Sequence, residues 1–377
     1  MIREAFGLIY AAQEIMNLRD LVDQRTVGAL PIGGRYRVID FPLSNMVNTG
    51  IRNVGVIASR NYNSLMDHIG SGKAWDLSRK SDGLFLLTPY ALRDNPGQYR
   101  GMIEALKSSM DYIRRAKQEY CVLSETYIIY NSTFDEMMKS HIETGADITV
   151  MYRTLDGDEL AAEKERYSDV RFDIDGSGRI VDLEIDPELT TLSKRSMKTY
   201  IIRKDILIYL VEECFSRGEY HFSENLLRNN LHRLKIQGFE HKGYVGSIDS
   251  VASYYSINMD LLNTDIRREL FVLKNRVLTK VADGVPARYM DTADVTGSLI
   301  ANGCIIEGKV ENSVIFRHVQ IGKGASVKNS IILPGTVVGD DADLEYVILD
   351  KNVSMRQRSR LVGNAGFPVV IRKGSLV

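Results

Sequence analysis

The chain has 377 residues, 44% of them hydrophobic and 26% charged, which is typical of a globular protein large enough for more than one core. Its 48 basic and 49 acidic residues leave a formal net charge of −1, so no general electrostatic attraction draws it to nucleic acid or to a membrane. The three cysteines lie far apart without CxxC spacing, and the sequence shows neither a signal-peptide pattern nor an apolar run long enough to span a membrane. We therefore expect a cytoplasmic protein with reduced thiols.

The first two-thirds of the chain alternates strand-like and helix-like segments. Apolar runs at residues 51–59 and 146–153 predict buried strands, and residues 63–69 and 101–118 predict helices. Such alternation predicts a largely parallel sheet with helices on both faces. From residue 170 onward the pattern becomes more antiparallel.

The stretch that precedes these elements, residues 5–45, starts as a buried strand and continues into an unusual turn. In an α/β nucleotide-binding domain this turn carries glycines, because backbone N–H groups must approach phosphate closely. Here residues 11–17 read AAQEIMN, with no glycine and with Glu14 where a phosphate would lie. The turn therefore has the position of a phosphate site without its chemistry.

Beyond residue 302 the apolar residues recur at a different period. Steps of six residues, interrupted by one slip of a single residue, relate Ile315, Ile321, Val327, Ile332, Val338 and Leu344. Recurrence at six residues, with Gly322 and Gly339 directly after an aliphatic residue, predicts a β-helix of hexapeptide repeats. Each coil of such a solenoid buries its aliphatic side chains by stacking on the next coil. A β-sandwich with accidental spacing is the alternative.

Several stretches together resemble the ADP-glucose pyrophosphorylase (glucose-1-phosphate adenylyltransferase) family. They are residues 33–45 (GGRYRVIDFPLSN), 50–52, 254–261 and 305–315. The first two belong to the N-terminal part of the chain, and the last belongs to the six-residue repeat. The resemblance therefore covers nearly the whole chain.

The fold that this resemblance implies belongs to the α/β class. It consists of a Rossmann-like nucleotidyltransferase domain with a mostly parallel sheet, followed by a C-terminal left-handed parallel β-helix of hexapeptide repeats. We expect the nucleotidyltransferase-like domain over residues 1–265, a linker region over residues 266–290 and the β-helix over residues 291–377.

The resemblance also implies a reaction, in which glucose 1-phosphate is joined to the α-phosphate of ATP and pyrophosphate is released with the help of aspartate-bound Mg²⁺. Several positions that it assigns to this chemistry hold other residues. The arginine of the triphosphate loop corresponds to Asn17, the following lysine to Val27, the two metal-binding aspartates to Thr126 and Ser247, and the sugar-phosphate lysine to Asp186. Phosphoryl transfer depends on positioned charges, so we expect little or no activity, no catalytic residue, no metal and no cofactor for this chain.

A chain that keeps the scaffold of the family but has lost the residues of its active site is similar to a GlgD-type regulatory subunit of glycogen biosynthesis. Such a subunit accompanies a catalytic ADP-glucose pyrophosphorylase subunit in a hetero-oligomer, expected to be a tetramer, and the catalytic partner would use the Mg²⁺. In the family, basic side chains near the domain interface hold phosphorylated effectors, and Arg25, Arg35 and Arg37 lie at such positions. The alternative is that these arginines pair with nearby acids such as Asp40.

Three other functions stay open. A divergent but active sugar-phosphate nucleotidyltransferase would need unusual metal ligation through Glu125 and Asp249. We expect Glu125 to point away, because residues 127–129 look like a continuation of its strand. A ligand-sensing scaffold would act without a catalytic partner. A hexapeptide acyltransferase would use His318 as its general base, which would leave the large first domain unexplained.

Overall fold

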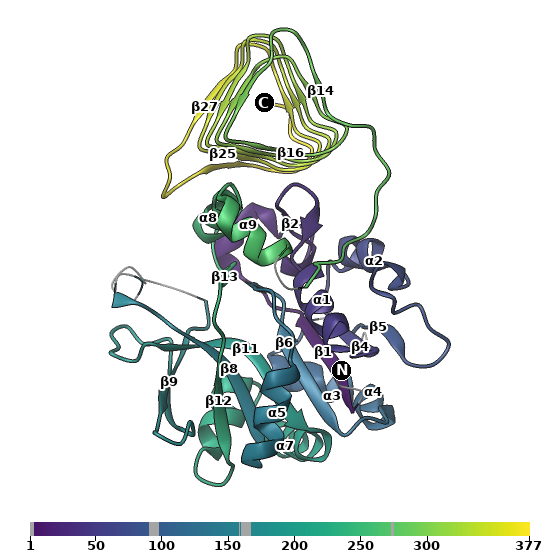
Figure 1. The fold of residues 1–377 in the computed structure, drawn as a ribbon, viewed down its shortest axis with the longest axis vertical. Helices are drawn as coiled ribbons and strands as arrows, with labels where there is room; N and C mark the ends of the chain where they lie inside the picture. Colours follow the sequence, from purple (N-terminus) through teal and green to yellow (C-terminus); the bar gives the residue numbers. More distant parts are fainter. Residues whose placement is uncertain (1–3, 90–97, 158, 160–166, 273–274) are drawn as a thin grey trace.

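The computed structural model describes residues 4–89, 98–157, 159, 167–272 and 275–377. It shows an α/β part that contains the N-terminus and a three-sided β-helix that contains the C-terminus (Figure 1). Among the described residues, no helix is long and apolar enough to cross a membrane.

The main sheet of the α/β part has nine strands within the described residues. Seven follow the order β10-β9-β11-β6-β1-β4-β5, while β8 pairs with both β11 and β12. The bounds of these strands are Ala5–Ala11 (β1), Asn53–Ala58 (β4), Gly83–Leu87 (β5), Tyr120–Glu125 (β6), Ile148–Thr154 (β8), Val170–Ile174 (β9), Ile180–Ile185 (β10), Lys194–Arg203 (β11) and Ile236–Glu240 (β12).

The centre of this sheet is parallel, as the alternating sequence pattern predicts. Strand β1 pairs in parallel with β4 and β6, and β4 pairs in parallel with β5. All seven residues of β1 are buried, which is expected of a strand covered on both faces. Strand β11 runs antiparallel to β6, β8 and β9, so the more antiparallel pattern after residue 170 is also present.

Helices lie on both faces of the sheet (Figure 1). Their bounds are Asp40–Thr49 (α1), Asn63–Ile69 (α2), Met102–Ser108 (α3), Met110–Arg115 (α4), Asp135–Thr144 (α5), Lys204–Ser216 (α7), Val251–Asp260 (α8) and Thr264–Phe271 (α9). The helix predicted over residues 101–118 is divided into α3 and α4 at Ser109, whose hydroxyl donates a hydrogen bond to the carbonyl of Ala105 (2.9 Å). Such a bond from serine to the preceding turn competes with regular helix bonding.

The β-helix consists of three parallel sheets, each with five strands among the described residues. The sheets follow the orders β14-β17-β20-β23-β26, β15-β18-β21-β24-β27 and β16-β19-β22-β25-β28. Their bounds are Arg288–Tyr289 (β14), Asp294–Thr296 (β15), Leu299–Ile300 (β16), Ile305–Ile306 (β17), Lys309–Glu311 (β18), Val314–Ile315 (β19), Gln320–Ile321 (β20), Ser326–Lys328 (β21), Ile331–Ile332 (β22), Val337–Val338 (β23), Asp343–Glu345 (β24), Val347–Leu349 (β25), Ser354–Met355 (β26), Arg360–Val362 (β27) and Val369–Ile371 (β28).

The six-residue recurrence in the sequence is confirmed. All six aliphatic residues of the predicted series belong to one buried cluster inside the triangular coils. The one-residue slip has a structural cause at one corner of the prism. Asn312, Asn329 and Tyr346 adopt left-handed φ angles of 46°, 46° and 52° there, and each follows the strand of one sheet and precedes that of the next. The slip therefore recurs once per coil at a tight corner.

One face of the β-helix packs against the α/β part. Strands β19, β22 and β25 contribute Val314, Ile331 and Ile348 to the same buried cluster as side chains of α1 and α8. Tyr255 of α8 donates a hydrogen bond from its hydroxyl to the carbonyl of Asn329 (2.7 Å). The two parts therefore share a continuous hydrophobic core, with α8, α9 and β2 (Pro31–Ile32) beneath the prism (Figure 1).

The segment between α9 and β14 crosses the surface of α1. The backbone N–H of Leu278 donates to the hydroxyl of Ser44 (2.8 Å), and the side-chain amide of Asn48 donates to the carbonyl of Arg276 (3.0 Å). Residues 273–274 of the predicted linker lie outside the described residues. These bonds fix the described part of the connection to the first domain.

Candidate functional site

The carboxyl ends of the central strands open into a cleft of about 460 Å³. In open parallel sheets, ligands bind at this edge. The lining includes Gln13 after β1, Glu125 at the end of β6, Asp186 after β10 and Lys198 from β11. The cleft is therefore at the position where a nucleotide-binding site is expected in this fold.

The turn after β1 is filled by its own side chains. Gln13 is buried, and its Nε2 donates to the carbonyl of Tyr10 (2.7 Å) and to Oε2 of Glu125 (3.2 Å). Its Oε1 accepts a hydrogen bond from the hydroxyl of Thr126 (3.0 Å), which is fully buried beneath it. A polar side-chain network thus occupies the turn in which phosphate would meet backbone N–H groups.

Glu125 faces the cleft, so the prediction that it points away was wrong. Strand β6 ends at this residue: the N–H of Thr126 still donates to the carbonyl of Tyr10 of β1 (3.2 Å), and the chain bends at residues 126–127. The apolar residues that follow form a separate short strand, β7 (Ile128–Ile129), which pairs with β13 (Gly246–Ser247). Burial raises the pKa of Glu125, while Lys198 and the Gln13 amide oppose that rise.

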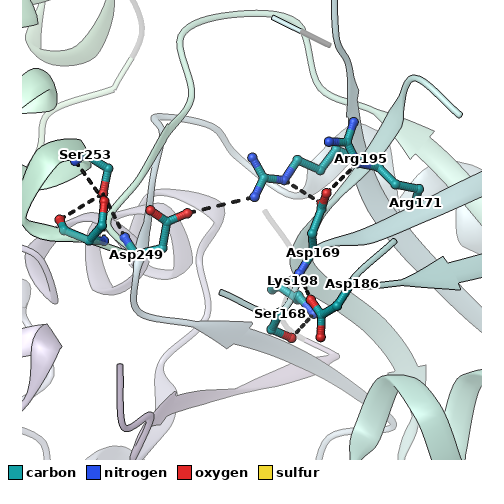
Figure 2. Close-up of polar contacts among 9 residues, drawn as sticks. Ser168, Asp169, Arg171, Asp186, Arg195, Lys198, Asp249 and Ser253 are labelled. Carbon is teal, nitrogen blue, oxygen red and sulfur yellow. Dashed lines mark hydrogen bonds and ion pairs between the residues drawn. The ribbon is translucent and has the colours of Figure 1, made fainter. Parts of the chain in front are cut away.

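Lys198 is a cleft residue that sequence reasoning missed. It is 2% exposed, and its Nζ donates to the hydroxyl of Ser168 (2.8 Å; Figure 2). It also donates to the hydroxyl of Ser223 (3.4 Å). Burial lowers the pKa of Lys198, and the negative charges of Glu125 and Asp186 act in the opposite direction. The sequence gives little signal for this residue, because β11 (KRSMKTYIIR) also carries Lys194, Arg195 and Arg203.

The cleft wall beside Lys198 is built from residues in an unfavourable backbone conformation. Ser168, Asp186 and Lys198 have φ angles of 50°, 47° and 51°, the left-handed region that non-glycine residues rarely adopt. Asp186 is held by two hydrogen bonds to Asp169: its N–H donates to the carbonyl (2.7 Å), and its Oδ1 accepts from the N–H (2.6 Å). Strained residues persist where their surroundings fix them, and they are concentrated at binding sites.

A chain of charged contacts continues from this wall toward α8. Asp169 accepts from Nε of Arg171 (2.8 Å) and forms an ion pair with Nε of Arg195 (2.9 Å). The other end of Arg195 faces Asp249, with Nη2 and Oδ2 separated by 4.0 Å, and the N–H of Asp249 donates to the hydroxyl of Ser253 (3.0 Å) (Figure 2). Asp249 therefore faces a guanidinium.

The carboxylates of this region do not fit the Mg²⁺ that the resemblance implies for the reaction. Mg²⁺ binds through carboxylate oxygens and needs them free of competing cations. Here Glu125 is in the field of Lys198, and Asp249 faces Arg195. Within the described ranges, no group of three or more His, Cys, Asp or Glu residues is arranged to hold a metal ion.

The five positions that the resemblance assigns to catalytic chemistry, and that hold other residues here, do not meet in one place. Asp186 lines the cleft, and Thr126 lies beneath it. Asn17 is exposed in a short 3₁₀ helix, Val27 is buried in the hydrophobic core, and Ser247 lies in strand β13, on the side of Arg195.

The three arginines proposed to bind anions have different surroundings. Arg25 is 4% exposed and forms an ion pair with Asp350 of the β-helix, which is 1% exposed. Arg37 donates from Nη1 to the hydroxyl of Ser64 (3.0 Å), and its backbone N–H, not its guanidinium, binds Asp40 (2.9 Å). Arg35 is exposed, with its guanidinium 5.2 Å from the ring centre of Tyr36.

Two lysines of the β-helix join Arg25 and Arg37 at the boundary between the two parts. Burial, followed by the positive charges of Arg37 and Arg25, lowers the pKa of Lys351 to about 7; Asp350 opposes this shift and Lys373 adds to it. We call Arg25, Arg37, Lys351 and Lys373 the interface cluster. It holds four basic side chains near the buried carboxylate of Asp350.

His318, the residue that an acyltransferase would need, lies at a corner of the β-helix. It is exposed and has a φ of 58°, and its backbone N–H donates to the carbonyl of Asn302 (3.2 Å). A histidine side chain at such a corner stacks on Gly303 of the preceding coil.

A parallel sheet that opens into a polar cleft, followed by a hexapeptide β-helix, defines a sugar-nucleotidyltransferase architecture. Residues 15–264 match the nucleotidyl transferase family, and residues 282–365 match the GlmU-like C-terminal hexapeptide family. The glycogen biosynthesis protein GlgD of Bacillus subtilis (strain 168) is 36% identical over 371 residues, which cover 98% of this chain and 96% of that protein. GlgD of Geobacillus stearothermophilus is also 36% identical, over 100% of this chain and 98% of that protein.

A catalytic relative is nearly as similar. The glucose-1-phosphate adenylyltransferase of Clostridium perfringens (strain 13 / Type A) is 32% identical over 89% of this chain and 85% of that enzyme. The chain belongs to the family of GlgD and the glucose-1-phosphate adenylyltransferases.

Proposed function

We propose that this chain is a non-catalytic subunit in glycogen biosynthesis, which assembles with a catalytic glucose-1-phosphate adenylyltransferase subunit and adjusts its rate. The observation that carries the proposal is that the two candidate metal carboxylates are compensated by the protein's own cations: Glu125 is in the field of Lys198, and Asp249 lies 4.0 Å from the guanidinium of Arg195. The names of the relatives, glycogen biosynthesis protein GlgD and glucose-1-phosphate adenylyltransferase, support glycogen biosynthesis as the pathway, and the catalytic partner is part of the proposal. In this account Mg²⁺ serves the catalytic partner, and the chain itself needs no cofactor.

The charge of the cleft is a second reason to expect little or no turnover by the chain alone. Its lining contains more carboxylates than cations: Glu14, Glu125, Asp186 and Glu224 against Arg100 and Lys198. Arg100 is already engaged by Glu104 at 2.7 Å. A nucleoside triphosphate would meet net negative charge there, and the loss of even one positioned stabilising group costs about 2.7–4 kcal/mol, or roughly 10²–10³ in rate.

The interface cluster is the proposed site for a phosphorylated effector. Arg25 also lines a cavity of about 280 Å³, and its Nη1 has no hydrogen-bond partner among the described residues. Gln13 and Glu14 line this cavity and the cleft as well, so a phosphate at Arg25 would lie next to the turn that borders both. A phosphate bound there would compete with the carboxylate of Asp350 for the guanidinium of Arg25.

The experiment that tests the proposal is expression of the chain with and without the catalytic subunit. We expect the two chains to co-purify as a hetero-oligomer, with a tetramer as the expected form, and the lone chain to form no detectable ADP-glucose from ATP, glucose 1-phosphate and Mg²⁺. Robust turnover by the lone chain would support a divergent enzyme instead. Failure to co-purify, together with effector-dependent thermal stabilisation of the lone chain, would support a ligand-sensing scaffold.

A further inference from the structure

Lys198 carries a buried ammonium on the wall of the cleft, and the function proposed above uses its charge without explaining how the chain holds that charge in place. Its Nζ donates to the hydroxyls of Ser168 (2.8 Å) and Ser223 (3.4 Å), two residues of the cleft lining that are far apart in the sequence. The backbone at Lys198 is left-handed, and strand β11 changes register with β8 between Ser196 and Tyr200, around this residue. The strand is thus irregular at the residue that carries the charge.

A buried ammonium is unfavourable unless negative charge compensates it. Glu125 and Asp186 line the same cleft as Lys198, and β11 pairs with β6 through Thr199 and Ser124, the residues next to Lys198 and Glu125. The negative charges of Glu125, Asp186 and Asp169 favour the charged form of Lys198. Glu125 in turn needs a compensating positive charge, because it is 7% exposed and, among the described residues, its side chain accepts one hydrogen bond, from Gln13. The ammonium and the carboxylates therefore lower the free-energy cost of burying one another's charge inside the cleft.

We propose that Lys198 is a fixed internal cation, which neutralises Glu125 and Asp186 in place of a divalent metal ion and so keeps such an ion out of the cleft. The chain then differs from a metal-dependent enzyme by a charge that it has gained as well as by ligands that it lacks. A second cation near Glu125 would be repelled by the ammonium and would find the carboxylate already compensated. This inference concerns the chain alone and stands whether or not a catalytic partner binds.

The first part of the test is a double-mutant cycle in the full-length chain, with Lys198→Met, Glu125→Gln and the double variant. Because removing one partner leaves the other buried and uncompensated, Lys198→Met should lower the Tm by roughly 6 °C or more. Adding Glu125→Gln should recover part of that loss. Lys194→Met is the matched control, since this lysine of the same strand is half-buried and, within the part of the chain that the structure describes, donates to the carbonyl of Ile174 (3.2 Å). Additive effects of the two substitutions would overturn the proposed neutralisation.

The second part measures Mn²⁺ uptake by electron paramagnetic resonance at constant ionic strength. We expect no saturable Mn²⁺ binding by the wild-type chain or by Lys194→Met, binding by Lys198→Met, and loss of that binding in the double variant with Glu125→Gln. If Lys198→Met does not fold, the double variant and Glu125→Gln still report whether the carboxylate and the ammonium are coupled. Equal Mn²⁺ affinity of the wild type and Lys198→Met, or no uptake by either, would overturn the proposed exclusion of the metal.

Discussion

Breaking the ion pair between Arg25 and Asp350 is the strongest single test of how the two parts of the molecule are joined. The residues are 325 positions apart in the sequence, and their side chains are 4% and 1% exposed. Breaking a buried pair by removing one partner costs about 3–5 kcal/mol, because the remaining charge stays buried without compensation. Asp350→Asn should therefore lower the free energy of unfolding by about that amount.

The structure also predicts an asymmetry between the two partners. Asp350→Asn removes the carboxylate that opposes the positive charges around Lys351, so Arg25, Arg37 and Lys373 are left to repel it. Arg25→Met leaves Asp350 with the backbone N–H of Lys351 (2.6 Å) and with nearby cations. Asp350→Asn should thus be the more destabilising change, and the double variant should be less destabilised than the sum of the two.

Urea unfolding followed by circular dichroism measures these differences, in chloride and in sulfate at equal ionic strength. Sulfate should stabilise Asp350→Asn more than the wild type, because it can replace the lost carboxylate. Asp341→Asn is the matched control: this acid of the β-helix faces Arg358 at 4.0 Å, with both side chains exposed, and should cost no more than about 1 kcal/mol. The reasoning is refuted if Asp350→Asn unfolds like Asp341→Asn, or if the two partners behave additively.

Two further predictions concern pH and the β-helix core. Since the folded protein lowers the pKa of Lys351 to about 7, the unfolded chain binds one more proton between about pH 7 and 10, and stability should rise with pH in this window by up to about 1.4 kcal/mol per unit. Lys351→Met should remove that slope, which unfolding titrations at several pH values will show. Ile321→Ala, at a fully buried position inside the coils, should cost about 2–5 kcal/mol, against a much smaller loss for the partly exposed Ile305→Ala.

Both predictions can be contradicted by the same measurements. A pH slope that persists in Lys351→Met would assign the titration to another group. Similar losses for Ile321→Ala and Ile305→Ala would show that the inward and outward positions of the coil are not those of the structure.

The fold was predictable because its signals are local and periodic. Steps of six residues place Ile321 and Val338 inside the prism whatever the rest of the chain does. The slip of one residue has no explanation in the sequence pattern, since it depends on the corners at Asn312, Asn329 and Tyr346, which adopt a left-handed backbone. Periodicity gives the layers of a solenoid, but the conformation of its corners comes from stacking on the next coil.

The cleft was less predictable because its contacts join distant strands. Glu125 was expected to point away, since the apolar residues after it look like more of the same strand; the turn at Thr126 ends β6 and leaves the carboxylate at the sheet edge. Lys198 acquires its role only when β11 lies beside β6, next to Glu125. Neither position can be predicted from the residues nearby in the sequence.

The arginines show the same limit at the domain boundary. Sequence position grouped Arg25, Arg35 and Arg37, whereas the structure separates Arg35 and adds Lys351 and Lys373 from the β-helix. The expected pairing of these arginines with Asp40 involves a backbone N–H of Arg37 and not a guanidinium. Which charges meet at an interface depends on how the two parts pack.

The central claim, that the chain modulates a catalytic partner without performing the reaction, is tested most directly by one rate measurement. ADP-glucose formation should be measured for the lone chain, for the catalytic subunit and for their co-expressed complex, at equal concentration of catalytic subunit and over a range of a phosphorylated effector. The account predicts no turnover by the lone chain and a complex whose rate or effector response differs from that of the catalytic subunit, with the effector response weakened by Arg37→Gln in this chain. Identical rates and effector curves for the catalytic subunit and the mixture, without a stable complex, would contradict it.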